Sequence, residues 1–359
     1  MFVSAGIASA ALKQNHSLDI YSTDGITYTP AALKEHVIGY RDEATKKTIG
    51  TYPTTEYDCQ ISYTAPHNAQ KYLANGKKNR FLIWTYEWKG RNVLPTGFAK
   101  CYKHCDMILP PSQFSREIFL ESGVPDSSLH VVPHGIDAEQ FSTTEKVVLP
   151  TTKRFKILVN LAQNHLRKNI PGMLDAYGKA FTNKDDIALI IKAKPKQPTS
   201  PFESDLNKCL KDFKSKFPNH AEYKLYEGYI DNMATLYNAV DAVYTMTHCE
   251  GFYMPALEGL AAGKINIAPN WGGQVDFLNN ENALLIDGKG ERADPNSMYW
   301  ERKHNAIWFK PSIDDAVDKL RFAYANYEEL NTELTNNIPN IREQYSWDAI
   351  TKRILNLCI

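Results

Sequence analysis

The chain of 359 residues is too long for one ordinary open-sheet domain and long enough for two. Its 41 basic and 41 acidic side chains cancel, which excludes a global field that favours nucleic acid or an anionic membrane. No apolar run is long enough to span a bilayer, and the first residues lack the pattern of a secretory signal. Because the six cysteines are scattered rather than arranged as a disulfide framework, we expect reduced thiols and a cytoplasmic protein.

Short β-rich runs alternate with helical stretches, and this alternation predicts an α/β fold with parallel sheets covered by helices. In the first half the predicted strands are residues 18–22, 60–63, 80–85, 106–109 and 129–132. In the second half they are residues 155–160, 188–192, 223–226, 242–246, 265–268 and 283–286. Helical periodicity is clearest over residues 170–181, 205–217, 313–327 and 347–357. Two Rossmann-like halves follow, with ligands expected at the carboxyl ends of the strands.

Two stretches interrupt this alternation. Residues 141–153 are polar and β-branched without helical periodicity, and they predict a linker between the two halves. Residues 287–299 combine Gly, Pro and mixed charges, and they predict an irregular excursion on the surface.

The most informative segment is EGFYMPALEGLAAGK, which begins at Glu250 and follows the predicted strand 242–246. Pro255 suits the first turn of a helix and Gly263 its exit, so a helix is predicted from about residue 255 to 262. The loop before it presents backbone N–H groups at a helix N-terminus, an arrangement that binds phosphate and sugar hydroxyls. Glu258 lies one turn into the helix, so the two carboxylates can contact different parts of one ligand. The alternative is a helix whose acidic residues only stabilise its dipole.

This segment resembles the signature of the retaining glycosyltransferases of the family 4 type, which have the GT-B fold and two glutamates separated by seven residues. The resemblance implies two facing Rossmann-like domains and a C-terminal helix that packs back on the N-terminal domain. It also implies that Glu258 would bind the ribose of a donor nucleotide and that Glu250 would face the transferred sugar. The backbone that would hold the sugar hydroxyls is that of Gly251, Phe252, Tyr253 and Met254. Family members more often have glycine at the position of Tyr253, whose bulk would lie beside the donor sugar.

Further segments resemble the family in the expected order, at residues 105–115, 131–137, 227–230, 272–276 and 345–348. The loop 227–230 resembles the one whose backbone contacts the nucleobase, which implies donor contacts for Tyr229 and Ile230. The likeness divides the chain into an N-terminal acceptor-side domain (1–145), a nucleotide-sugar-binding domain (146–340) and a terminal helix (341–359) that crosses back.

Arg167 and Lys168 precede a predicted helix, where two cations can neutralise a diphosphate. In the family a lysine at the position of Lys168 contacts the leaving phosphates, usually with an arginine about six residues earlier. That earlier position is Ala162 here, so Arg167 or Lys192 would have to compensate. The alternative is an exposed basic start of a helix.

The N-terminal half offers two further candidates. Residues 4–8 resemble the glycine loop that approaches the donor phosphates from the opposite domain, which implies a phosphate contact for Gly6. The predicted strand 80–85 is followed by Tyr86 and Glu87, where many relatives carry a histidine that contacts the donor sugar. A carboxylate at the end of a strand is a catalytic or acceptor-orienting candidate, and a solvated glutamate between packing aromatics is the alternative.

Together these features predict transfer of a sugar from a nucleoside-diphosphate sugar, with retention at the anomeric carbon implied by the resemblance. Glu250, Lys168 and Glu87 are the catalytic candidates, and the acceptor is open among glycan, lipid, protein and modified DNA. No metal or cofactor is expected, since the sequence has no D-x-D motif and the cysteine–histidine cluster at residues 101–105 lacks a second ligand pair. The rivals are a GT-B epimerase or phosphorylase, and a catalytically silent module that binds a nucleotide sugar or a glycan.

Overall fold

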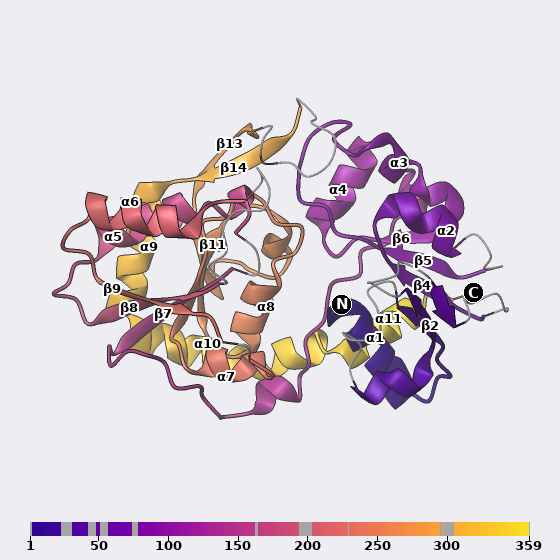
Figure 1. Ribbon diagram of the computed structural model, residues 1–359, viewed down its shortest axis with the longest axis horizontal. Helices are drawn as coiled ribbons and strands as arrows, with labels where there is room; N and C mark the ends of the chain where they lie inside the picture. The colour runs from indigo at the N-terminus through magenta and orange to yellow at the C-terminus, as the bar shows by residue number, and fades with distance from the viewer. Residues whose placement is uncertain are drawn as a thin grey trace.

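The computed structural model describes residues 2–22, 31–41, 48–50, 57–73, 78–161, 164–193, 203–228, 230–294, 297 and 305–358. Two α/β domains face each other, the N-terminal one in indigo and purple and the C-terminal one in pink and orange (Figure 1). None of the helices in these ranges combines the length and the apolar character that a membrane crossing needs.

The C-terminal domain is built on six parallel strands in the order β12-β11-β10-β7-β8-β9. They are β7 (Phe155–Asn160), β8 (Ile187–Lys192), β9 (Glu222–Tyr226), β10 (Ala242–Tyr244), β11 (Ile265–Pro269) and β12 (Ala283–Ile286). All six were predicted from the sequence, with ends that differ by at most two residues. The strand order reverses direction between β7 and β10, and doubly wound sheets bind ligands at the carboxyl ends of such a pair.

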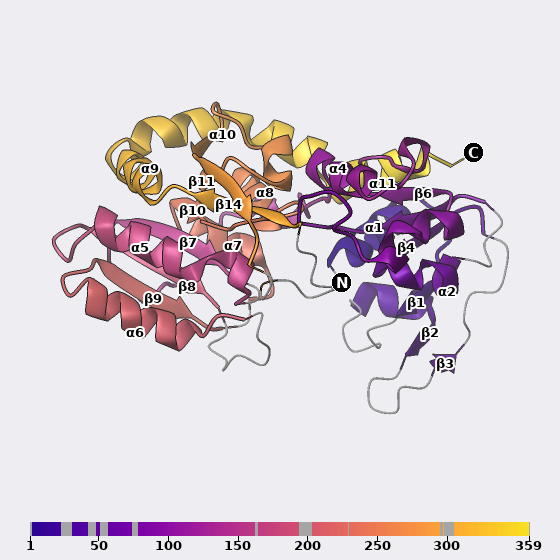
Figure 2. The same ribbon diagram turned by 90° about the horizontal axis from the view of Figure 1, so that it is seen from above.

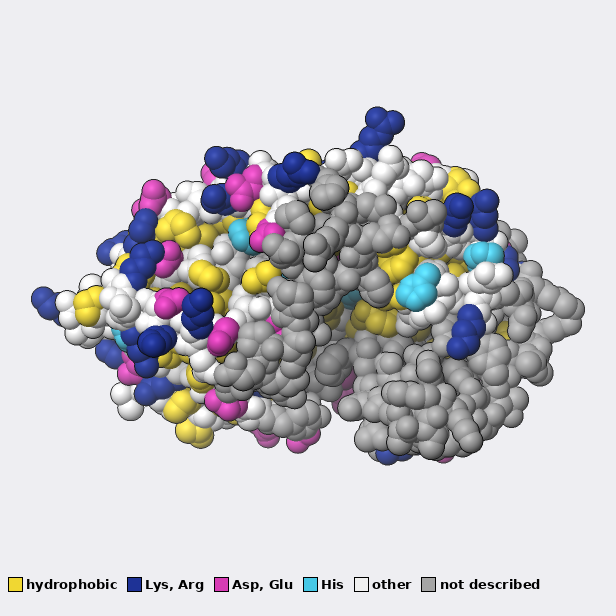
Figure 3. All heavy atoms as spheres, turned by 45° about the horizontal axis from the view of Figure 1, so that its top comes forward, with side chains coloured by type: hydrophobic (Ala, Val, Ile, Leu, Met, Phe, Trp, Pro, Cys, Tyr) yellow, Lys and Arg dark blue, Asp and Glu magenta, His cyan; other side chains and the backbone are white. Residues whose placement is uncertain are grey.

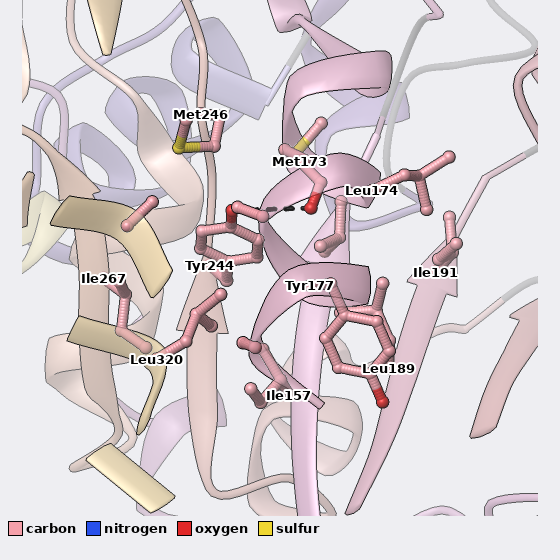
Figure 4. Close-up of a cluster of buried hydrophobic side chains, with 14 of the residues drawn as sticks. Ile157, Met173, Leu174, Tyr177, Leu189, Ile191, Tyr244, Met246, Ile267 and Leu320 are labelled. Atoms are coloured by element: carbon pink, nitrogen blue, oxygen red, sulfur yellow. Dashed lines mark hydrogen bonds between the residues drawn. The ribbon is translucent and has the colours of Figure 1, made fainter. Parts of the chain in front are cut away.

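Helices cover both faces of this sheet (Figure 2). Successive residues of a strand point to opposite faces, so Ile157 belongs to one core and Leu158 to the other. Figure 4 shows the first core, where Tyr244 of the sheet lies against α5 and Leu320 of α9. Burial of each large side chain contributes about 1.5–3 kcal/mol. The first core is covered by α5 (Ile170–Ala180), α6 (Leu206–Lys216) and α9 (Ile313–Ala325), and the second by α7 (Met233–Asn238), α8 (Met254–Ala261) and the end of α10 (Tyr327–Gln344).

The N-terminal domain contains two small sheets. A parallel sheet consists of β4 (Gln60–Tyr63), β5 (Arg80–Ile83) and β6 (Met107–Leu109), in that order. A second sheet consists of β1 (Ile20–Ser22), β2 (Val37–Arg41) and β3 (Thr48–Gly50), of which β2 and β3 are antiparallel and were not predicted. The helices of this domain include α2 (Ala69–Leu73), α3 (Thr96–Ala99) and α4 (Gln113–Glu121).

The predicted strand 129–132 is wrong. The segment forms one isolated parallel bridge, from Leu129 to Ile108 of β6, and Val132 N donates to Pro110 O over 3.0 Å, but no strand extends over these residues. Pro110 and Pro111 follow β6 directly and lack the N–H groups that a longer ladder would need.

The predicted excursion at residues 287–299 is wrong in its first part, which forms a strand. Residues Gly288–Arg292 are β13, which pairs antiparallel with β14 (Ile307–Pro311). This hairpin reaches the N-terminal domain, because Ile307 N donates to Lys89 O over 2.7 Å and the Trp308 ring stacks 6.3 Å from that of Trp88. The pairing was missed because the partner strand lies beyond the predicted stretch.

The glycine loop predicted at residues 4–8 is also wrong, because these residues belong to helix α1 (Phe2–Lys13). This helix packs against α11 (Trp347–Leu355), the terminal helix, within the N-terminal domain (Figure 1). A Cβ on Gly6 would lie 2.3 Å from Trp347 Cδ2, so the glycine lets the two helices approach closely. Alanines in the segment favour a helix and offset the cost of a glycine within it. Gly6 therefore serves helix packing.

Two segments connect the domains. After a 3-10 turn at Gln140–Ser142, residues 143–153 of the predicted linker form neither helix nor strand. At the other end of the chain, α10 leads into α11, whose buried Ile350 and Ile354 complete a core with Ile83 and Leu109 of the N-terminal sheet. The terminal helix thus crosses back, as the resemblance implied.

Candidate active site

The loop before α8 contains a residue with an unfavourable backbone conformation. Helix α8 begins at Met254, one residue before the predicted start, and Gly263 follows its end with a φ of 68°. Tyr253 has a φ of 67°, a left-handed conformation that is costly for a bulky residue and is often found at functional sites. Its buried ring lies 5.5 Å from Lys168 Nζ, so the loop and the basic pair lie side by side.

Glu250 is buried and paired with both predicted cations. Its Oε1 lies 2.5 Å from Lys168 Nζ and 2.7 Å from Arg167 Nη1. Thr247 Oγ1 lies 3.4 Å from the same oxygen. The structure therefore brings together three of the residues that the sequence singled out.

The turn that carries the cations, Leu166–Lys168, is fastened to the loop after β10. Arg167 O accepts hydrogen bonds from His248 N over 2.7 Å and from Thr247 Oγ1 over 3.0 Å. Asn169 caps α5 and also donates to Met246 O over 3.0 Å. Both loops follow the strands at which the sheet reverses its order, so the cluster lies where doubly wound sheets bind ligands.

Glu87 joins the cluster from the N-terminal domain, where its Oε1 lies 3.4 Å from Arg167 Nε. Its neighbours Tyr86 and Trp88 are 2% and 1% exposed and pack into the domain core, as the alternative reading of this segment expected. Glu87 itself is mostly buried, with 19% of its side chain exposed, and it is not an ordinary solvated glutamate.

Burial and charge set the ionisation of this cluster. Burial would raise the pKa of Glu250, but the charges of Arg167 and Lys168 outweigh it and lower the pKa to about 2. Burial lowers the pKa of Lys168 despite the carboxylate beside it, and burial raises that of Glu87 against the opposing charge of Arg167. Burial and the two adjacent cations lower the pKa of His165 to about 3, so its ring is neutral. Glu250 is therefore ionised at neutral pH.

Glu258 lies apart from this cluster, half-buried on α8. Tyr237 of α7 donates to Glu258 Oε2 over 2.5 Å, and burial raises the pKa of Glu258 to about 7. Sequence reasoning missed Tyr237, because no motif accompanies it.

Of the predicted nucleobase loop, Tyr229 lies outside the described residues, and Ile230 is half-buried against the core that contains α7 and α8. Lys192, one candidate for the missing arginine, donates to Gly228 O over 2.6 Å. Ala162 lies outside the described residues. Arg167 is thus the candidate that reaches Glu250.

The two domains touch at Gly251. Its carbonyl oxygen accepts a hydrogen bond of 2.6 Å from Ser112 Oγ at the start of α4. A Cβ on Gly251 would lie 2.3 Å from Thr85 Cγ2 and 2.8 Å from Tyr86 O. Nearby, Gln113 N donates to Asp276 Oδ2 over 2.7 Å. These contacts join the two domains, and sequence reasoning missed Thr85 and Ser112 because their partners lie in the other domain.

Two cavities lie away from this cluster. One of about 640 Å³ is lined by Lys89, Asn92 and Trp271 among others, and one of about 740 Å³ by residues of α1 and α11. Within the described ranges, no group of three or more His, Cys, Asp or Glu side chains could hold a metal ion. Basic and acidic side chains are interspersed over the C-terminal domain (Figure 3), in keeping with the balanced charge of the chain.

No family model matches the chain. Among named proteins, it is 22% identical over 254 residues to a lipopolysaccharide 1,2-N-acetylglucosaminetransferase of Salmonella typhimurium, covering 69% of this chain and 62% of the relative. It is 21% identical over 272 residues to an uncharacterized glycosyltransferase of Methanocaldococcus jannaschii, covering 72% of this chain and 61% of that relative. The chain thus spans less than two thirds of the length of either relative.

Solved structures match over more of the chain. A glycosyltransferase of Rickettsia africae superposes with a TM-score of 0.69 at 13% identity, covering 99% of this chain and 93% of the other. Anabaena HepE in complex with UDP superposes with a TM-score of 0.60 at 12% identity, covering 83% and 78%. The chain has the GT-B fold, and the predicted fold class is confirmed.

Proposed function

We propose that this chain is a retaining glycosyltransferase that transfers the sugar of a nucleoside-diphosphate sugar without the help of a metal ion. The observation that carries the proposal is the buried cluster in which Arg167 and Lys168 meet Glu250 beside the N-terminus of α8. The names of the two relatives by sequence support sugar transfer, and the UDP bound to the HepE structure supports a nucleotide donor.

The cluster suits a donor diphosphate. Two buried cations next to a helix N-terminus attract a group with two negative charges. In the described structure the carboxylate of Glu250 neutralises them. A bound diphosphate would take over this role and release Glu250 to the hydroxyls of the sugar. Arg167 would then stand in for the arginine that the family carries at the position of Ala162.

In the proposed reaction the bond between the anomeric carbon and the diphosphate oxygen breaks, and its electron pair leaves with the diphosphate. The acceptor oxygen forms a bond to the same carbon on the same face, and a departing phosphate oxygen takes the proton of the acceptor hydroxyl. Arg167 and Lys168 would stabilise the departing charge, which is where preorganised donors contribute most. Glu87 would orient the acceptor hydroxyl from the N-terminal domain.

Nucleotide release from a panel of UDP-, GDP- and ADP-sugars, measured with EDTA present, tests this proposal. We expect one donor to raise the melting temperature and to release its nucleotide, and Lys168→Met to slow the release by about 10²–10³-fold. The matched control is Lys216→Met, which removes a lysine paired with Asp175 on the outside of the same domain. A thermal shift without release or transfer to any acceptor would identify a silent binding module. Dependence on inorganic phosphate would identify a phosphorylase, and the absence of any shift and any release would reject the proposal.

A further inference from the structure

A chain of hydrogen bonds leads from the end of β7 to Glu258. Asn160, the last residue of β7, donates from Nδ2 to Tyr237 Oη over 3.3 Å. Tyr237 in turn donates to Glu258 Oε2 over 2.5 Å. The tyrosine hydroxyl therefore uses both its accepting and its donating capacity within the protein.

Tyr237 is held rigidly at this place. Its side chain has no exposed surface, and its ring packs 5.9 Å from that of Phe141 in the segment between the domains. Asn232 caps the start of α7, and Asn238 Nδ2 at its end donates to Thr143 O over 2.8 Å. Both ends of α7 are thus fixed, so the hydroxyl presents one defined position to Glu258.

Tyr237 is the one hydrogen-bond partner of the Glu258 carboxylate that the described residues provide. A carboxylate accepts at about four lone-pair positions, and a partner on Oε2 fixes the plane of the group while Oε1 keeps its accepting capacity. A carboxylate with a fixed plane loses less rotational freedom when it binds the two adjacent hydroxyls of a ribose.

We propose that Tyr237 is a positioning residue for ribose recognition, acting through Glu258 and supported by Asn160. This inference rests on the proposed function, which assigns the donor ribose to Glu258. The tyrosine itself does not need to touch the ligand, since its hydroxyl is already engaged on both sides.

Among the described residues, Tyr253 in the loop before α8 also interacts electrostatically with Glu258. Burial raises the pKa values of both tyrosines, so both are neutral at physiological pH. Arg342 of α10 packs on the same helix but donates from Nε to Ala261 O over 2.8 Å, at the far end of α8. Tyr237 therefore acts on Glu258 as a hydrogen-bond donor and not as a charge.

Calorimetry with nucleoside diphosphates tests the inference. UDP, GDP and ADP are compared on the wild type, and the tightest binder is then compared with its 2′,3′-dideoxy form. Above pH 7, where Glu258 is ionised, we expect Tyr237→Phe to weaken the ribonucleotide by roughly tenfold, the loss of a hydrogen bond to a charged group, and to leave the dideoxy form unchanged. The matched control is Tyr177→Phe, which removes the hydroxyl of another buried tyrosine of this domain, one that donates to Glu222 O over 2.8 Å.

The outcomes separate the inference from the proposed function. If no nucleoside diphosphate binds the wild type, the proposed function and the inference fall together. If the wild type binds but Tyr237→Phe weakens neither form, or weakens both forms equally, the positioning role is rejected and the proposed function stands. In a Glu258→Ala background, Tyr237→Phe should have no further effect on affinity, because a residue that acts through Glu258 has nothing left to position.

Discussion

Arg167 connects the two domains through a single guanidinium group, whose Nη1 lies 2.7 Å from Glu250 Oε1 and whose Nε lies 3.4 Å from Glu87 Oε1. Glu250 belongs to the C-terminal domain and Glu87 to the N-terminal one. The positive charge of Arg167 therefore acts on one carboxylate from each domain. A guanidinium suits this role because it offers donors in several directions within one plane.

We predict that Arg167→Met lowers the free energy of unfolding by about 3–5 kcal/mol, because it leaves two buried carboxylates with Lys168 alone. Urea denaturation followed by fluorescence measures the loss. Arg116→Met is the control, since Arg116 pairs with the exposed Asp126 and should cost less than about 1 kcal/mol. Similar losses in the two variants would mean that the buried pairs contribute no more than a surface pair.

Lys168→Met should lower turnover far more than donor affinity, since the charge on the diphosphate is greatest as it departs. The loss in kcat is expected to be about 10²–10³-fold, the scale for removal of one transition-state donor. Steady-state kinetics and calorimetry separate the two effects, with Lys216→Met as the control. Wild-type activity that disappears with EDTA and returns with magnesium would contradict this role of Lys168.

We predict that the free energy of unfolding of the ligand-free protein changes with pH because of Glu258. Burial raises its pKa from the ordinary 4.5 to about 7, so the folded state binds the proton more tightly than the unfolded one. The contribution of Glu258 to the free energy of unfolding is fully present below about pH 4.5. It falls by on the order of 3 kcal/mol as the pH rises to 7. Relative to Glu258→Gln, the wild type should therefore lose stability over this range. A difference that does not change with pH would mean that Glu258 has an ordinary pKa.

Gly251→Ala should push the domains apart, because its Cβ would lie 2.3 Å from Thr85 Cγ2. We expect a larger radius of gyration in small-angle scattering and a lower rate of transfer. Gly97→Ala is the control, since a Cβ there meets its nearest neighbour, His67 Cβ, at an ordinary 3.6 Å. An unchanged scattering profile for Gly251→Ala would show that the loop adjusts without opening the domains.

The product should keep the anomeric configuration of the donor sugar. NMR of the anomeric proton, recorded before mutarotation, reads it directly. An inverted product would instead require a general base, and Glu87 would be the first candidate because burial raises its pKa.

The sequence by itself determined the C-terminal sheet, the helix α8 and the fold class. These features rest on local patterns: apolar runs for β7 and β8, Pro255 at the start of α8 and Gly263 after its end. Local patterns suffice there because strands buried on both faces and helix ends have their own residue preferences. The same patterns placed Arg167, Lys168 and Glu250 on loops at the carboxyl ends of the strands.

Only the tertiary structure decided which of these residues meet. Lys168 and Glu250 are 82 positions apart in the chain, and Glu87 reaches Arg167 from the other domain. Gly6 illustrates the same limit, because its packing against Trp347 depends on a helix from the opposite end of the chain. The hydrogen bond from Tyr237 to Glu258 likewise arises from two helices that share one face of the sheet. Such contacts follow from how sheets and helices pack in space, and local residue preferences along the chain do not specify them.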